Sequence, residues 1–271
     1  MEEKWIYYNH ALISTCWPHE DADLTSLEKM WSIPEKPLFA RWTENFDCGY
    51  ETDFWACILD KPFEPENLKA KRRYEINKGN KNFYCKKLSC EDTSDMYNVY
   101  TESLKGYSGR INIQPKRDFM VQWEGVIKNP DMLVLGVYER DTDLMCGYAH
   151  CIKRDIYIPI SSFKTMVSKE RDGVNFALMY GICDFYKNDL ANGSYLCDGW
   201  RNVLHDTNFQ GWLEKYFQFR KAYCTLHIQY RGCLKYLIPF LCRHRTFVEK
   251  IIPKRFKKTA EAVFNMQEWS V

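Results

Sequence analysis

The sequence predicts an α+β fold with a central mixed, mostly antiparallel sheet flanked by helices. Hydrophobic residues make up 45% and charged residues 27% of the 271-residue chain, which is ordinary globular usage. In the second half, segments of strand and helix character follow in the order strand, strand, strand, helix, strand, helix, strand. No repeated strand–helix series with a glycine-rich turn accompanies them, which excludes a doubly wound nucleotide-binding fold.

The first half is expected to contain three strands rich in aromatic and branched residues, at 38–42, 54–59 and 83–88. Helices are expected at 67–80, 92–106 and 115–128. Leu68, Arg72 and Ile76 recur at helical spacing in the first of these helices, and Gly79 lies near its end. The polar, proline-containing region 15–37 is expected to be a loop with a short helix.

The second half begins with an expected antiparallel hairpin, because two apolar runs flank a turn at 141–143. Its strands and the third strand are expected at 132–139, 145–153 and 156–167. Pro159 in the third strand indicates an edge or a bulge. Helices at 174–188 and 207–217 then alternate with strands at 195–197 and 222–230, and a basic, partly amphipathic tail follows.

Twelve cysteines are scattered from Cys16 to Cys242 without a dense framework, and the acidic N-terminus has no apolar stretch of signal-peptide length. We therefore expect reduced thiols, a cytoplasmic location and no disulfides. No Cys-x-x-Cys pair is present, so no metal site is expected. No apolar run reaches the ~18 residues of a membrane span.

Charge is distributed unevenly along the chain. Residues 1–66 carry 14 acidic and 5 basic side chains, whereas residues 69–87 carry 8 basic side chains and one acidic one. Residues 231–258 carry 9 basic side chains and one acidic one. Two basic segments indicate an anionic partner such as a phosphate-bearing substrate, RNA or a membrane surface. A basic face balanced by the acidic N-terminal segment explains them equally well.

The strand that ends at Met166 and Val167 leads into Ser-Lys-Glu-Arg-Asp-Gly-Val-Asn and then an apolar helix. Here Arg171, Gly173 and Asn175 take the places of an Arg/Gln-x-x-Gly-x-Gly/Ala motif, in a loop one residue short and with Asn as the last residue. Residues 212–221 are similar in place and kind to the motif leu-tyr-glu-x-x-gly-phe, which precedes a final strand pair. In this order of elements and motifs the sequence resembles the GNAT (acyl-CoA N-acyltransferase) fold.

Residues 68–79 are similar to the basic helix of FemAB-like proteins, which carry two GNAT-type halves and act on cell-envelope precursors. The chain also resembles related GNAT proteins of bacterial surface-polysaccharide loci. The resemblance implies three parts: a truncated N-terminal GNAT-like half at 1–91, an acyltransferase domain at 92–230, and a basic helical tail at 231–271.

The resemblance implies an acyltransferase that moves an acetyl group from acetyl-CoA to an amine or hydroxyl of a sugar-nucleotide or other envelope-polysaccharide precursor. Amides at a helix N-terminus bind pyrophosphate, and a glycine lets the backbone approach it closely. The residues expected to hold the donor are Val167, Lys169, Arg171, Gly173, Val174, Asn175 and Asn208. Two alternatives stay open: a FemAB-type transferase that uses aminoacyl-tRNA, and a non-catalytic GNAT-like binding protein.

The segment 198–208 follows a short strand, and in the GNAT fold this strand end faces the reacting carbonyl. His205 is the candidate general base, because imidazole titrates near neutral pH. Asp198 and Arg201 are expected to form a charge-assisted pair. Tyr223, or alternatively Tyr230, would donate a proton to the leaving thiolate. For each of these side chains a purely structural role is the alternative.

Arg72, Arg73 and Lys78 lie on the basic helix and are the candidate substrate-binding residues. They would hold a phosphate of a sugar-nucleotide, a lipid-linked precursor or tRNA, or simply form a solvated face. The tail segment 243–258 mixes apolar and basic residues. It would make peripheral contact with an anionic membrane, or dock on the acidic N-terminal region of the same chain.

Overall fold

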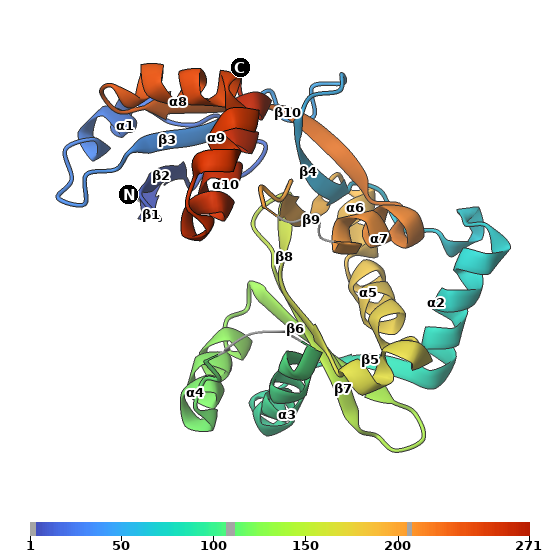
Figure 1. The fold of residues 1–271 in the computed structure, drawn as a ribbon. Coiled ribbons are helices and arrows are strands. Elements are labelled where there is room, and N and C mark those ends of the chain that lie inside the picture. Colours follow the sequence, from blue (N-terminus) through green and yellow to red (C-terminus); the bar gives the residue numbers. More distant parts are fainter. Residues whose placement is uncertain (1–3, 107–111, 205–207) are drawn as a thin grey trace. The chain divides into compact units, whose positions relative to one another are not determined.

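The computed structural model describes residues 4–106, 112–204 and 208–271, in two compact units (Figure 1). Unit 1 comprises Met1–Cys57, Trp200–Asn208 and Lys221–Val271, and unit 2 comprises Ile58–Gly199 and Phe209–Arg220. The chain therefore passes more than once between the units. The division into functional parts at 1–91, 92–230 and 231–271 follows the chain linearly and stays a prediction.

The sheet of unit 2 has the strand order β9-β8-β7-β6-β5. Its strands are β5 (Phe83–Lys87), β6 (Met132–Glu139), β7 (Met145–Ile152), β8 (Tyr157–Thr165) and β9 (Tyr195–Trp200). The pairs from β5 to β8 are antiparallel, and β8 pairs with β9 in parallel. The predicted hairpin is confirmed, since β6 and β7 flank the turn at 141–143. The register shifts between β7 and β8 at His150 and Cys151, close to Pro159.

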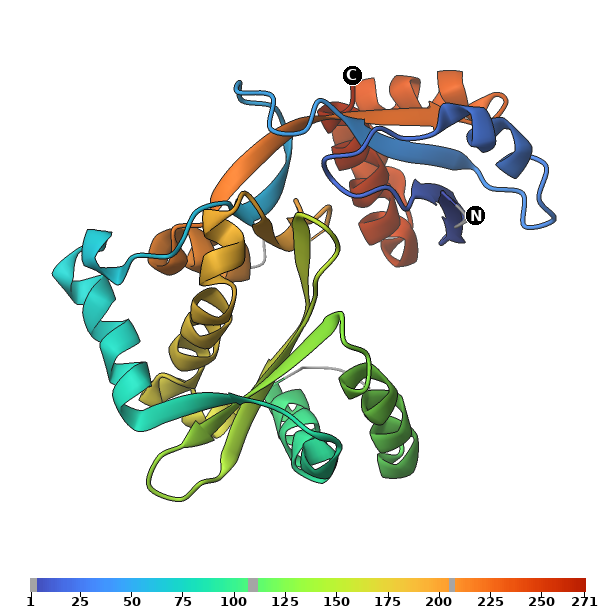
Figure 2. The same ribbon diagram turned by 180° about the vertical axis from the view of Figure 1, so that it is seen from behind.

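Helices cover both faces of this sheet, as Figures 1 and 2 show. Helix α5 (Val174–Phe185) packs on β5, β6 and β7, while α3 (Thr93–Ser103) and α4 (Lys116–Ile127) pack on the other face. Strand β6 is buried on both sides, which explains its nearly continuous apolar run. Val134 and Tyr138 join Met96, Phe119 and Trp123 of α3 and α4 in one core cluster.

The remaining helical segments of unit 2 are α2 (Ala70–Asn82), α6 (Lys187–Ala191) and α7 (Asn208–Phe217), the last starting at the boundary between the units. Short 3₁₀ turns occur at Pro65–Asn67, Cys90–Asp92, Leu104–Gly106 and Val167–Asp172. Helix α2 packs on α5. A Cβ on Gly79 would come within 2.6 Å of the Gly173 carbonyl oxygen and 3.0 Å of the Ala177 nitrogen, so glycine is required there for the close approach.

Unit 1 is built on the strand order β1-β2-β3-β10, with β1 (Trp5–Tyr8), β2 (Ala11–Ser14), β3 (Phe39–Glu44) and β10 (Arg220–Tyr230). Strand β4 (Phe54–Leu59) runs from this unit into the next. The hairpin of β1 and β2 lies outside the predicted strands. Its turn residues Asn9 and His10 have φ values of 47° and 64°, the left-handed geometry of a tight hairpin.

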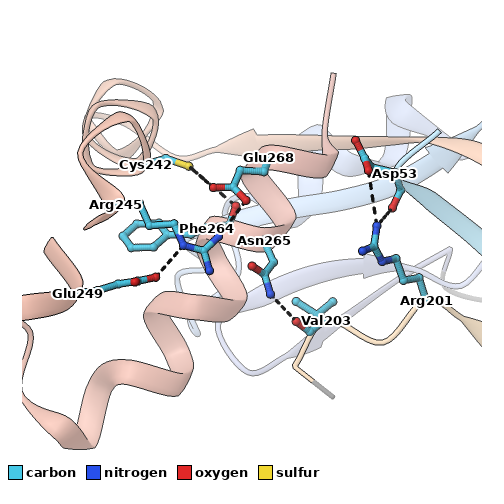
Figure 3. Close-up of polar contacts among 9 residues, drawn as sticks. All are labelled: Asp53, Arg201, Val203, Cys242, Arg245, Glu249, Phe264, Asn265 and Glu268. Atoms are coloured by element: carbon cyan, nitrogen blue, oxygen red, sulfur yellow. Dashed lines mark hydrogen bonds and ion pairs between the residues drawn. The ribbon is translucent and has the colours of Figure 1, made fainter. Parts of the chain in front are cut away.

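The helices of unit 1 are α1 (Leu24–Met30), α8 (Leu234–Arg243), α9 (Arg245–Ile251) and α10 (Lys257–Trp269), with a 3₁₀ turn at Lys254–Phe256. Asp23 caps α1, the short helix expected within 15–37. In the C-terminal helices Arg245 contacts Glu249 at 2.7 Å and Glu268 at 2.8 Å (Figure 3). This pairing ties α9 to α10.

The observed architecture confirms the α+β fold class with a mixed, mostly antiparallel sheet and flanking helices. Most predicted elements are found within a few residues of their predicted bounds. The strand expected at 195–197 extends to Trp200 and thus includes Asp198. All twelve cysteines are free thiols in this structure.

Replacing Gly79 with alanine should destabilise unit 2 by ~1–3 kcal/mol, because the new methyl group meets backbone atoms of the α5 N-terminus. Gly125→Ala on α4 is the matched control, since a Cβ there meets nothing within 4 Å. It should stabilise the helix by ~0.5–1 kcal/mol. Urea denaturation of both variants measures the difference, and equal free energies of unfolding would contradict the packing argument.

Candidate active site

The parallel pair β8–β9 separates part-way along its length. Its register covers Tyr157–Tyr195, Ile158–Leu196 and Pro159–Cys197, and within the described residues the pairing ends there. Strand β8 nevertheless continues to Thr165, paired with β7, and β9 continues to Trp200. Asp198 is the first residue of β9 beyond the last pair. The site is therefore located where two neighbouring strands part.

Asp198 is half-buried at this point. Burial raises the pKa of its carboxyl to about 6, while a hydrogen bond from the Gln210 side chain on α7 acts in the opposite direction. Because the folded pKa exceeds the usual value, the proton stabilises the folded state below pH ~4, and this contribution is lost as the pH rises through about 6. A carboxyl poised near neutral pH can accept and return a proton.

Aromatic side chains connect β8, α5 and α7 beside this carboxyl. Phe163 of β8 lies 5.2 Å, between ring centroids, from Phe209 in the first turn of α7. Phe209 stacks on Trp212 at 5.5 Å, and Trp212 lies 5.2 Å from Phe176 of α5. These rings fix the α7 turn that carries Gln210. Phe163, Phe209 and Gln210 lie outside the site that the sequence predicts.

The expected partner of Asp198, Arg201, forms an ion pair with Asp53 at 3.8 Å and also donates to the Asp53 carbonyl (Figure 3). Its guanidinium carbon lies 3.8 Å from the centroid of the Trp269 ring and 4.4 Å from that of Trp55. All four residues belong to unit 1. The contacts place Arg201 in an aromatic cluster, so its assignment as a catalytic residue stays a prediction.

His205, the candidate general base, lies outside the described residues. Tyr223 lies on β10 with its ring edge-on to Trp55, at 6.2 Å between centroids. Tyr230 has a buried hydroxyl without a hydrogen-bond partner among the described residues, and burial raises its pKa to about 12. The proton-donor role of Tyr223 therefore stays a prediction.

The predicted donor loop lies between β8 and α5, as expected, and forms a 3₁₀ turn at Val167–Asp172. Gly173 follows with a φ of 95°, which glycine adopts without strain. The Glu102 carboxylate of α3 accepts from the backbone N–H groups of Val167 at 2.7 Å and Ser168 at 3.3 Å. A carboxylate of the chain itself thus accepts the hydrogen bonds that the first two amides of this loop could otherwise donate to a ligand.

Two other residues expected to hold the donor have side-chain partners within unit 2. Lys169 forms an ion pair with Glu139 at 2.5 Å, and Asn175 accepts from the Thr165 hydroxyl at 2.6 Å. Val174 is buried, while Arg171 is exposed. Asn208 is exposed in the first turn of α7.

The structure brings one predicted substrate-binding residue to the loop. Lys78 donates to the Arg171 carbonyl at 2.5 Å, which places the basic end of α2 beside the turn. Arg73 donates instead to the Glu66 carbonyl at 3.3 Å, and Arg72 is half-buried elsewhere on the same helix.

Part of this loop is already bonded within the chain. The two leading amides are bonded to Glu102, the amide of Gly173 donates to the Glu170 carbonyl at 3.1 Å, and Gly79 of α2 packs directly on Gly173. An incoming pyrophosphate would have to displace the Glu102 carboxylate.

Within 4–106, 112–204 and 208–271, no group of three or more His, Cys, Asp or Glu side chains is placed to hold a metal ion. Over the same residues, no helix has the length and apolar character needed to cross a membrane.

Solved structures with a similar fold were found, whereas no protein-family model and no curated protein sequence matches the chain. The C-terminal domain of a protein assigned as a lysylphosphatidylglycerol synthetase from Agrobacterium fabrum matches with a TM-score of 0.51 and 9% identity, over 90% of this chain and 84% of that one. PaiA N-acetyltransferase from Thermoplasma acidophilum, solved with coenzyme A, matches with a TM-score of 0.34 and 16% identity, over 39% and 72%. The ribosomal-protein-S18-alanine N-acetyltransferase from Escherichia coli matches with a TM-score of 0.30 and 12% identity, over 38% of this chain and 58% of that one.

The fold is therefore GNAT-like, and the full-length likeness extends it over nearly the whole chain. The match to the Agrobacterium fabrum domain supports the fold part of the expected resemblance. It does not specifically support the FemAB-like subgroup or the surface-polysaccharide proteins, because that domain comes from a different kind of protein.

Removing the Glu102 carboxylate should free the two amides that it accepts from. In Glu102→Ala, we expect the backbone N–H groups of Val167 and Ser168 to exchange with deuterium at least ~10-fold faster, because a charge-assisted bond is lost. Glu124→Ala is the control, since Glu124 pairs with Lys128 on the surface of α4. Unchanged exchange in Glu102→Ala would contradict the assigned contact.

Proposed function

We propose that the protein is an acyltransferase in which Asp198 removes a proton from an amine or hydroxyl acceptor. One observation carries the proposal: a half-buried carboxyl with a pKa of about 6 lies where β8 and β9 stop pairing. A general base is most effective when its pKa is near the working pH. The GNAT-like fold supports the same class of reaction.

In this proposal Asp198 is ionised at neutral pH and takes the proton of the attacking acceptor. The Gln210 side chain holds the carboxylate in place through its hydrogen bond. The Gly199 amide donates to the Cys197 sulfur, a weak acceptor, at 3.3 Å. We assign this amide to the carbonyl oxygen of the donor, where it would stabilise the developing negative charge. His205 and Tyr223 stay further candidates for proton transfer.

The acyl donor implied by the fold is acetyl-CoA. Its pyrophosphate would need the amides of the 167–175 loop, and Glu102 already occupies two of them. Acetyl-CoA is therefore expected to bind weakly to the unmodified protein and more tightly to Glu102→Ala. No step of the proposed chemistry depends on the pyrophosphate.

The occupied loop favours a second donor, aminoacyl-tRNA, because an aminoacyl ester needs no pyrophosphate site. The basic helix α2, which ends beside the loop through Lys78, would contact the RNA backbone. The similar domain from Agrobacterium fabrum bears the name of a lysylphosphatidylglycerol synthetase, and an aminoacyl group is the kind of group that this name concerns.

The acceptor and the membrane contact are proposals that follow from the resemblance. An amino-sugar nucleotide or another envelope-glycan precursor would supply the nucleophile. Exposed apolar side chains on the basic C-terminal helices support peripheral contact with an anionic membrane: Tyr236, Phe240, Phe247 and Ile251 are 59–72% exposed. A non-catalytic binding role is the alternative that an inactive, folded protein would favour.

The test measures transfer of a radiolabelled acyl group from acetyl-CoA, and separately from lysyl-tRNA and alanyl-tRNA, to hydroxylamine and to a panel of amino-sugar nucleotides. With one of these donors, Asp198→Asn should transfer at least ~10²-fold more slowly than the unmodified protein at pH 7.5. Asp155→Asn, which changes an exposed carboxyl in the turn before β8, should leave the rate unchanged.

The outcomes show which donor the protein uses and whether Asp198 takes part in the transfer. Transfer from an aminoacyl-tRNA alone would establish the second donor, and transfer from acetyl-CoA would establish the first. A folded protein that transfers from none of them, or an Asp198→Asn variant with full activity, would overturn the proposal.

A further inference from the structure

Unit 1 contains a pocket of about 800 Å³ whose lining includes neither Asp198 nor Gln210. It is lined by parts of β2 and β3, by residues 200–204 and by one side of α10. In the sheet, Leu12 and Ala40 pack with Leu27 of α1. Their neighbours Ile13 and Arg41 alternate to the opposite face, where the pocket lies.

Arg41 is the unusual residue of this pocket. Its guanidinium donates to the thioether sulfur of Met266 at 3.6 Å, which is its one hydrogen bond to the described residues. No carboxylate in 4–106, 112–204 or 208–271 forms an ion pair with it. Burial alone lowers its pKa, which indicates a desolvated cation without a nearby counter-charge.

Other arginines of the chain have the partners that a partly buried guanidinium requires. Arg245 has two glutamates, Arg220 has Asp60 at 2.5 Å, and Arg201 has Asp53. A buried charge without a partner lowers stability. Arg41 is therefore a cation whose counter-charge is not supplied by the described part of the chain.

The walls of the pocket are held in place before any ligand arrives. Figure 3 shows the Asn265 amide of α10 donating to the Val203 carbonyl at 2.9 Å, and Arg201 meeting Asp53. These contacts fix the segment 200–204 against α10 and the start of β4. A preformed wall reduces the ordering that binding requires.

The lining combines rings with polar groups. Phe39, Phe54 and Trp200 contribute aromatic surface, and Thr43 and Asn202 are among the polar side chains. Aromatic faces contact flat or ring-shaped molecules, and scattered polar groups fix their orientation. An unbranched acyl chain would leave the polar groups unpaired.

We propose that this pocket binds a ring-shaped organic anion whose carboxylate or phosphate contacts the guanidinium of Arg41. Arg offers a planar fork of N–H donors that matches either group. The ring would lie against the aromatic side chains of the lining. This site is independent of the proposed transfer at Asp198.

Isothermal titration calorimetry compares a ring compound that carries a carboxylate with one that carries a phosphate, each against its neutral partner. Indole-3-acetate is compared with neutral indole-3-ethanol, and glucose 6-phosphate with glucose; inorganic phosphate alone reports binding of the anion without a ring. The unmodified protein should bind one of the ring anions at least ~10-fold more tightly than its neutral partner. Inorganic phosphate should bind more weakly than that ring anion.

Arg41→Met should abolish the preference for the anion and leave the neutral compound bound as before. Its melting temperature should be unchanged or higher, because a half-buried charge without a carboxylate partner among the described residues is removed. Arg231→Met, at an exposed position of unit 1, is the control and should keep the preference. Arg41→Lys, which keeps the charge but loses the fork, should retain part of it if Arg41→Met fails to fold.

Three results would overturn the proposal: equal binding of anion and neutral partner, no binding of any probe, or an anion preference that survives in folded Arg41→Met. Asp198→Asn should bind the ring anion normally. Failure of the acyl-transfer proposal would therefore leave this result unaffected.

Discussion

The early end of the β8–β9 pairing is the constraint on which the candidate active site depends. Backbone groups of a buried strand need partners, and beyond Pro159 and Cys197 the two strands no longer supply them to each other. Asp198 occupies this point, and a turn of α7 contributes Gln210 beside it. At this position the Asp198 carboxyl is shielded from water, and no cation is among the groups that shift its pKa. Burial therefore raises the pKa to about 6.

In the donor loop a carboxylate is stabilised by hydrogen bonds from backbone amides. Amides at the start of a helical turn attract an anion, and here the anion is Glu102 of α3. The close contact of Gly79 with Gly173 brings α2 onto the same turn, and Lys78 follows it there. The loop thus has the location expected in a GNAT-like fold, while two of its amides and the carbonyls of Arg171 and Asp172 are already bonded to side chains of α3 and α2.

Much of the fold follows from sequence patterns, because the strands of unit 2 are short apolar runs separated by clear turns. Strand β6 and helix α5 begin at the predicted residues since burial on both sides leaves a continuous apolar run. The β1–β2 hairpin was missed because Asn9 and His10, rather than a glycine, adopt its left-handed turn. The division into two units could not be predicted from segments taken in chain order. Strand β10 and the C-terminal helices belong to the same unit as the N-terminal strands, although they are far apart in the sequence.

The candidate site was predicted in part. The sequence predicts Asp198 as a site residue, because its segment follows a short strand, but it predicts Arg201 as the partner. The structure gives Arg201 to Asp53, which lies far away in the sequence. Glu102 and Gln210 lie on helices with no motif around them, so only their positions in the fold reveal their roles.

The central claim is that Asp198 titrates near neutral pH, and carbon-detected NMR of aspartate carboxyls tests it without any substrate. Spectra of the ¹³C-labelled protein between pH 3 and 8 should contain one aspartate signal with a midpoint near the expected pKa of about 6. That signal should be absent from Asp198→Asn and should shift to a higher midpoint in Gln210→Ala, which lacks the hydrogen bond that lowers the pKa. If the signal missing from Asp198→Asn has its midpoint at or below pH ~4, the value of an ordinary exposed aspartate, the account is contradicted.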